Sequence, residues 1–169
     1  MIVIAEADES HLPQIVELWK ELTDFHAERD PHFTRAEDGH VHFEKHLRGL
    51  LGSAEWHVLV ALDGERVVGY AMGQLARKPP VFKETAYGLI SDLVVTAAYR
   101  RRSIGQDLLT ETVAWFAEHG LRRAEVRVAT CNEVAQAFWD IEVFKDFMAM
   151  KFIEIDPEDW RLEEPPDEE

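Results

Sequence analysis

Apolar residues recur along the chain at two spacings, one typical of helices and the other of strands. A stripe that starts at Leu12 and continues to about residue 29 has helical spacing, and Asp30-Pro31 ends it. Shorter, denser apolar runs predict strands, and Asp63-Gly64 between two of them predicts a hairpin turn. Strands are expected at residues 1–5, 56–62, 67–75, 85–95, 124–129 and 147–155, and helices at residues 12–29, 35–51, 103–119 and 133–143. The pattern is that of a mixed α/β protein.

The stretch from Leu89 to Phe116 organises the rest of the sequence. It begins as a strand that is too apolar for one of its faces to be exposed to solvent. It ends as a helix with one apolar side, formed by Ile104, Leu108, Leu109, Val113 and Phe116. Three arginines, Arg100 to Arg102, lie between them and are followed by Ser103 and Gly105. Unpaired N–H groups at a helix start, together with arginine charge and a glycine that lets a ligand approach, predict an anion site suited to a pyrophosphate.

Two blocks of this sequence have a recognisable pattern. The first is Tyr99-Arg-Arg-Arg-Ser-Ile-Gly followed by Leu108-Leu109, and the second contains Asn132, Ala135, Phe138 and Phe144. In this order they resemble the acyl-CoA signature and the Asn-x-x-Ala-x-x-Phe helix of the GNAT N-acetyltransferase superfamily. The chain departs from that pattern at Ser103 and Val143, where the family has glycine, and at Trp139, where tyrosine is common.

The resemblance implies an α/β GNAT acyl-CoA N-acyltransferase fold, a mixed central sheet flanked by helices in the order β-α-α-β-β-β-α-β-α-β. One domain is expected at residues 1–155, followed by an acidic tail at residues 156–169. The resemblance also implies acetyl-CoA as co-substrate, with no metal. Cofactor contacts are expected from Leu93, Val94, Val95, Arg100, Arg101, Arg102, Ser103, Ile104, Gly105, Gln106, Asn132 and Trp139.

Two of these positions leave alternatives open. If the backbone at Ser103 needs a positive φ, serine costs on the order of 1 kcal/mol, whereas in an ordinary N-cap conformation serine caps the helix well. Trp139 cannot protonate a departing thiolate, because its indole N–H donates hydrogen bonds but is not a usable acid. Trp139 therefore either forms a wall near the thioester or packs in the core.

Ser91 and Asp92 are the candidate catalytic residues. Where relatives similar to the polyamine acetylases carry a catalytic glutamate, this chain has Ser91, and Asp92 projects to the opposite face of the strand. A buried carboxylate at that position can act as a base, directly or through water, or can be a structural partner of an arginine or of the backbone. A backbone N–H near Val94 or Val95 is expected to polarise the thioester carbonyl.

The acceptor pocket is expected near the end of the first helix, with His26, Asp30 and Phe33 as candidate substrate-binding residues; surface or core roles are the alternative. Acids on the early helices, such as Glu21 and Asp24, are expected to attract a cationic amine. His42 and His46 lack a third ligand at a recognisable offset, which favours a solvated helix face over a metal pair.

Composition narrows the classes of partner. The net charge of −15 disfavours nucleic acid as a partner, because proteins bind the phosphate backbone through basic patches. No apolar run is long enough to span a membrane, and the first residues do not resemble a signal peptide. The single cysteine, Cys131, excludes an internal disulfide and suits a cytoplasmic location. A homodimer is frequent in the resembled family and is compatible with this sequence.

We therefore expect an N-acetyltransferase that moves an acetyl group from acetyl-CoA directly to a primary amine of a small molecule or peptide. The alternative from another class is a non-catalytic acyl-CoA-binding or regulatory module with the same groove.

Overall fold

A five-stranded mixed sheet forms the centre of the protein. The computed structural model describes residues 1–155, 157 and 158, so most of the expected acidic tail lies outside the described residues. The strands lie in the order β1-β2-β3-β4-β5. Pairing is antiparallel except between β4 and β5, which are parallel. The bounds are Ile2–Glu6 (β1), Trp56–Asp63 (β2), Arg66–Arg77 (β3), Ala86–Val95 (β4) and Ala124–Val126 (β5).

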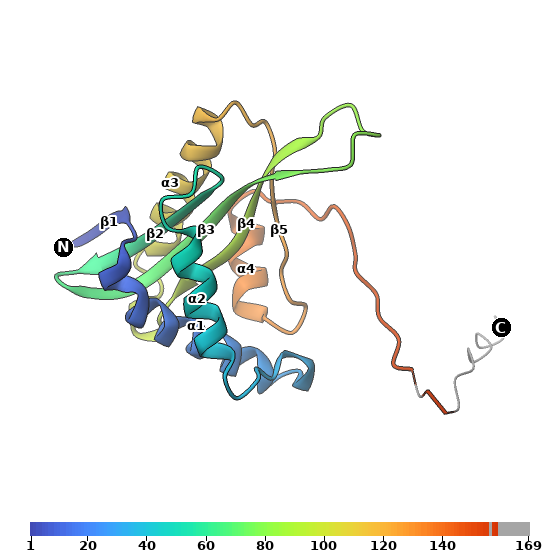
Figure 1. The fold of residues 1–169 in the computed structure, drawn as a ribbon, viewed down its shortest axis with the longest axis horizontal. Coiled ribbons are helices and arrows are strands. Elements are labelled where there is room, and N and C mark those ends of the chain that lie inside the picture. The colour runs from blue at the N-terminus through green and yellow to red at the C-terminus, as the bar shows by residue number, and fades with distance from the viewer. Residues whose placement is uncertain (156, 159–169) are drawn as a thin grey trace.

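Helices cover both faces of this sheet (Figure 1). Helices α1 and α2 lie on one face and α3 lies on the other, while α4 follows β5. Asp8 starts the first helical segment with a capping box, in which its side chain accepts from the Ser10 N–H and His11 reaches back to the Asp8 N–H. The bounds are Leu12–Ala27 (α1), Gly39–Leu50 (α2), Ile104–Glu118 (α3) and Glu133–Ile141 (α4), with short 3₁₀ turns at Glu9–His11 (η1), Pro31–Phe33 (η2) and Ala97–Tyr99 (η3).

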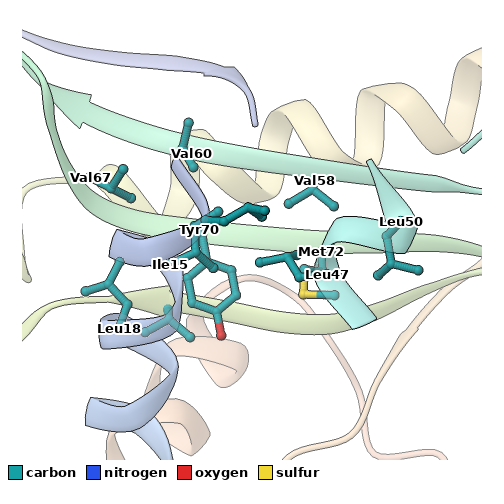
Figure 2. Packing of buried hydrophobic residues seen from close by; sticks show 11 residues of the cluster. Ile15, Leu18, Leu47, Leu50, Val58, Val60, Val67, Tyr70 and Met72 are labelled. Carbon is teal, nitrogen blue, oxygen red and sulfur yellow. The ribbon is translucent and has the colours of Figure 1, made fainter. Parts of the chain in front are cut away.

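The core consists of three apolar clusters that follow these layers. The first joins α1 and α2 to the sheet around Tyr70, whose side chain is fully buried (Figure 2). The second packs α3 against the other face through Ile104 and Leu108. The third joins α3, β5 and α4 around Phe116 and Trp139. The predicted apolar side of α3 is corrected at one position: Thr112 is buried there, with its hydroxyl donating to the Leu108 carbonyl, whereas Val113 is 39% exposed.

The element order agrees with the prediction through α4, but the expected last strand is wrong. Residues 147–155 are not part of the sheet and leave the body of the protein as an extended arm (Figure 1). A short apolar run predicts an extended backbone, yet a strand also needs a neighbour that supplies hydrogen bonds. Several other elements are shorter than expected: α1 ends at Ala27, α2 begins at Gly39, β5 ends at Val126 and α4 ends at Ile141.

Candidate active site

The two parallel strands, β4 and β5, separate at a β-bulge in β4. Met72 of β3 pairs with Asp92 and the next residue, Gly73, pairs with Ile90, so Ser91 is the extra residue on β4. Pairing between β4 and β5 stops at the same level, since its last pair joins Ile90 to Val126. Beyond Ile90, β4 therefore continues with β3 on one side and an open edge on the other.

Backbone groups of β4 point out along this open edge. The Thr96 N–H donates to the Val68 carbonyl of β3 at 3.0 Å. Because the direction of N–H and C=O alternates along a strand, the groups of Val94 also point to β3, and those of Leu93 and Val95 point away from it. Donation from Arg100 Nε to the Val95 carbonyl at 3.0 Å marks the outer side. Of the two N–H groups expected to face a thioester, the Val94 N–H is thus excluded and the Val95 N–H remains.

The turn between β4 and α3 has an unusual backbone. Arg101 and Ser103 both have φ of 61°, in the left-handed region, while Arg102 between them does not have positive φ. Alternation of this kind gathers successive N–H groups into a concave anion-binding nest. Ser103 makes no side-chain cap, so the strained alternative for this serine is the one observed. The N–H groups from Ser103 to Gln106 precede the first helical hydrogen bonds and carry the positive end of the α3 dipole.

The three arginines of the turn have different roles. Arg100 holds the turn in place: besides its bond to Val95, its guanidinium lies 3.7 Å from the Glu21 carboxylate. Arg101 and Arg102 are exposed, and Arg102 lies over the Tyr99 ring at 4.9 Å. Arg101 and Arg102 are therefore the members of the trio that are free to meet an anion.

Gly105 lies where α4 packs against the start of α3, and its expected contact with a cofactor stays a prediction. A Cβ at this position would lie 3.2 Å from the Phe138 ring and 3.6 Å from Leu93. The missing side chain thus lets α4 pack against the start of α3, and the Gly105 N–H is what remains for a ligand. Ile104 is buried, so only its backbone can contact a cofactor. The Gln106 amide donates to Glu142 at 2.7 Å, a second link between α3 and the end of α4.

Asp92 lies on the face of β4 that is covered by α1 and α2. The Tyr70 hydroxyl donates to its carboxylate at 3.2 Å, and Figure 2 shows the ring of Tyr70 among the buried residues of this face. Burial raises the pKa of Asp92, against the opposing effects of the Tyr70 hydrogen bond and the charge of His46. Ser91 is exposed on the bulge. Tyr70 and Asp92 thus form a partly buried polar contact between β3 and β4.

The expected acceptor residues gather at the end of α1. His26 Nε2 accepts from the Asn132 amide at 2.8 Å, while the Asn132 oxygen caps α4 by accepting from the Ala135 N–H. Burial lowers the pKa of His26, and the nearby charge of Arg29 lowers it further, so its imidazole is neutral at pH 7. Phe33 packs against His26 with ring centroids 5.0 Å apart, and Asp30 caps η2 by accepting from the His32 N–H. His26, which is expected to bind the acceptor, thus contacts Asn132, which is expected to bind the cofactor.

Two departures from the family pattern are explained by packing and backbone. Trp139 is buried in the third cluster, edge-on to Phe138 and to Phe144, with ring centroids 5.0 and 4.8 Å away. Core packing accounts for this tryptophan, and a contact with a thioester stays a prediction. Val143 has φ of 68°, in the region that glycine favours, so it holds a glycine-type backbone at the position where the family carries glycine.

The acids of α1 do not face the site as free charges. Glu21 accepts from the Thr96 hydroxyl at 2.8 Å and from the Ala97 N–H at 2.9 Å, and Asp24 forms an ion pair with Arg35. Glu21 therefore holds the turn that precedes α3, and Asp24 holds the connection between α1 and α2. Glu21 and Tyr70 support the site, yet neither belongs to a motif; only their contacts across the fold reveal these roles.

Two classes of site find no support in the described residues. Within that part of the chain, no group of three His, Cys, Asp or Glu side chains is arranged to hold a metal ion. None of the helices in residues 1–155 has the length and hydrophobicity that crossing a membrane requires.

A sheet that opens beside the start of a helix, with backbone donors on both, is the arrangement that the sequence resemblance leads one to expect. Comparison with known families agrees: the acetyltransferase (GNAT) family model matches residues 12–141, and the chain belongs to this family. No curated protein sequence matches the chain.

Solved structures with the same fold share little sequence with it. A tetramutant of the BH1408 protein from Bacillus halodurans has a TM-score of 0.82 and 18% identity, over 90% of this chain and 99% of that one. The aminoglycoside N-acetyltransferase AAC(6')-Iy, in complex with CoA, has a TM-score of 0.70 and 14% identity, over 91% and 94%. The aminoglycoside 6'-N-acetyltransferase AAC(6')-IG from Acinetobacter haemolyticus has a TM-score of 0.72 and 14% identity, over 91% and 98%.

Proposed function

We propose that this protein transfers an acetyl group from acetyl-CoA directly to a primary amine of a small molecule or peptide. The observation that carries the proposal is the open edge of β4 beyond Ile90, which presents the Leu93 and Val95 N–H groups beside the nest at residues 101–103. A pyrophosphate at the nest and a pantetheine arm along the strand edge would use N–H groups that point away from β3 or precede the first bonds of α3, and that donate to no other group among the described residues. That solved structures of the same fold include a CoA complex and aminoglycoside acetyltransferases supports the cofactor and a small-molecule amine.

The residues of the turn divide the binding of CoA among them. The N–H groups of residues 103–106 donate to the pyrophosphate, and Arg101 and Arg102 add charge that is not already paired. Arg100 keeps β4 and the turn together through Val95 and Glu21. The Val95 N–H donates to the carbonyl oxygen of the thioester, where negative charge grows as the amine attacks.

The amine approaches from the end of α1, past the neutral imidazole of His26 and the partly exposed ring of Phe33. Its nitrogen forms a bond to the thioester carbon, the carbon–sulfur bond breaks, and CoA leaves as a thiolate that takes a proton from water. Asp92 accepts the proton that the amine loses, through water, because its raised pKa makes it a stronger base than an ordinary aspartate.

Release of free CoA thiol in the presence of a panel of amines tests this proposal, with calorimetric CoA binding measured on the same protein. Acetylated amine and free thiol in equal amounts would support acetyl transfer. Binding of CoA without transfer to any amine would instead favour the non-catalytic acyl-CoA-binding module. Absence of both binding and transfer would reject the site itself.

A further inference from the structure

A hollow of about 300 Å³ lies at the end of the sheet where β2 begins. Its wall is formed by the end of β1, the loop after α2, the start of β2 and the last turn of α3, with Glu6, Trp56, His57, Trp115 and His119 among the lining residues. Helix α3 has 15 residues and begins beside the nest, so the hollow lies about 22 Å from the nest, at the opposite end of this helix. Its volume suits a small ligand.

Negative ends of two helix dipoles meet at this hollow. Helix α2 ends at Leu50, which lines it, and α3 ends at Glu118, next to the lining residue His119. Both helices end toward the top of the view in Figure 1. The last carbonyl groups of a helix carry partial negative charge, and the exposed carboxylate of Glu6 adds a full one. Among the described residues that line the hollow there is no lysine or arginine, so a cation is favoured there.

His57 contributes an acceptor that has no donor in the fold. Its ring stacks on Trp115 with centroids 4.9 Å apart, and its Nε2 lies 3.4 Å from the Glu6 carboxylate. Burial lowers the pKa of His57, against the opposing charges of Glu6 and two glutamates of α3, so the imidazole is neutral at pH 7. With its N–H on the side of Glu6, the ring has a lone pair on Nδ1. This atom is buried and has no hydrogen-bond partner among the described residues, which is unfavourable until a donor reaches it.

We propose that this hollow binds a small organic cation, a primary ammonium group carried on an apolar or aromatic body. The ammonium N–H groups donate to the Glu6 carboxylate and to carbonyl groups at the helix ends, and Nδ1 of His57 is a further acceptor. The body of the ligand packs against Trp56 and Leu50. An anion of the same shape is repelled by these groups. The site is separate from the acceptor pocket at the end of α1, and this inference does not depend on acetyl transfer.

Titration with 2-phenylethylamine tests the proposal, followed by the NMR signals of the indole N–H groups, which tryptophan-to-phenylalanine variants assign. The expected result is a saturable shift of the Trp56 and Trp115 signals below about 10 mM amine. The neutral 2-phenylethanol and the anionic 3-phenylpropionate have nearly the same shape and should bind at least about tenfold more weakly. Absence of a saturable shift, equal binding of the anion, or shifts confined to Trp139 near the expected acceptor pocket would each overturn the proposal.

Two variants locate the cation within the hollow. Glu6→Gln keeps the size of an exposed side chain and removes its charge, so the affinity for 2-phenylethylamine should fall about tenfold with the core undisturbed. His57→Phe keeps an aromatic ring on Trp115 and removes both nitrogens, and the affinity should fall about threefold to fivefold. The matched control is Glu17→Gln, an exposed glutamate of α1 outside the hollow, which should bind like the unmodified protein. Unchanged affinity in Glu6→Gln, or an equal loss in Glu17→Gln, contradicts the site.

Discussion

At the scale of the residue, the folded protein disfavours the ionised form of Asp92. Burial raises its pKa above the value of an ordinary aspartate, and Tyr70 supplies its hydrogen bond. A raised pKa means that the folded protein keeps this proton to a higher pH than the unfolded chain does. Ionised Asp92 therefore lowers stability, and this penalty grows as pH rises through the folded pKa.

The variant Asp92→Asn is expected to separate catalysis from stability. Asparagine still accepts from the Tyr70 hydroxyl but cannot take a proton, so the transfer rate should fall by about a hundredfold or more. The free energy of unfolding at pH 7 should not fall, and its gain over the wild type should disappear toward pH 3. Urea unfolding at several pH values and the thiol-release assay measure both, with the exposed Asp140→Asn as control. A variant that loses stability at pH 7 would show that Asp92 is a structural partner.

Ser103 carries backbone strain, with φ of 61° and no cap hydrogen bond. We expect Ser103→Gly to raise the free energy of unfolding by about 0.5–1 kcal/mol, because glycine adopts positive φ without a Cβ clash. Ser103→Ala keeps the strain and should leave stability nearly unchanged. Thermal unfolding of the two variants gives the comparison. Equal effects of alanine and glycine would mean that the left-handed backbone is not the source of the cost.

At the scale of the element, the turn between β4 and α3 assigns separate roles to neighbouring arginines. Arg102→Ala should weaken CoA binding about fivefold to tenfold, as the loss of one charge-assisted contact implies, and leave stability within about 0.5 kcal/mol. Arg100→Ala should lower the stability, because the bond to Val95 and the ion pair with Glu21 are lost. Calorimetry and urea unfolding measure the two effects. The reverse assignment of effects would contradict the geometry of the turn.

The contact between His26 and Asn132 joins α1 to α4 and depends on pH. The pKa of His26 is lowered, so between that value and 6.5 the unfolded chain binds the proton and the folded protein does not. Stability from this group is present above pH 6.5 and is lost as pH falls through the folded pKa. We expect His26→Gln to flatten the fall in stability between pH 7 and pH 5, since glutamine offers an acceptor that does not titrate. Urea unfolding at several pH values measures this slope.

At the scale of the whole molecule, the body is expected to fold without the arm. The three core clusters lie within residues 2–144, and the arm adds to none of them. A chain that ends at residue 146 should therefore unfold cooperatively, with a midpoint close to that of the full chain. Urea unfolding of the two chains makes the comparison; a truncated chain that fails to fold would show that the arm belongs to the core.

The amino-acid sequence alone determined the local elements and the place of the turn. Helical spacing after Leu12 and the run before Val95 fixed the layers, because an apolar face has to be buried whatever its neighbour. The prediction of an anion site at residues 100–106 used residues close together in the chain, and the positive φ of Arg101 and Ser103 is compatible with such a site.

Only the tertiary structure decided which groups meet across the sequence. The bulge at Ser91 sets which N–H groups point away from β3, and no spacing in the sequence records it. Glu21 and Tyr70 gain their roles from Thr96 and Asp92, which are distant in the chain. Residues 147–155 show the same limit: their apolar run predicts an extended backbone, but whether an extended segment becomes a strand depends on the edge it meets, and that edge is a property of the assembled sheet.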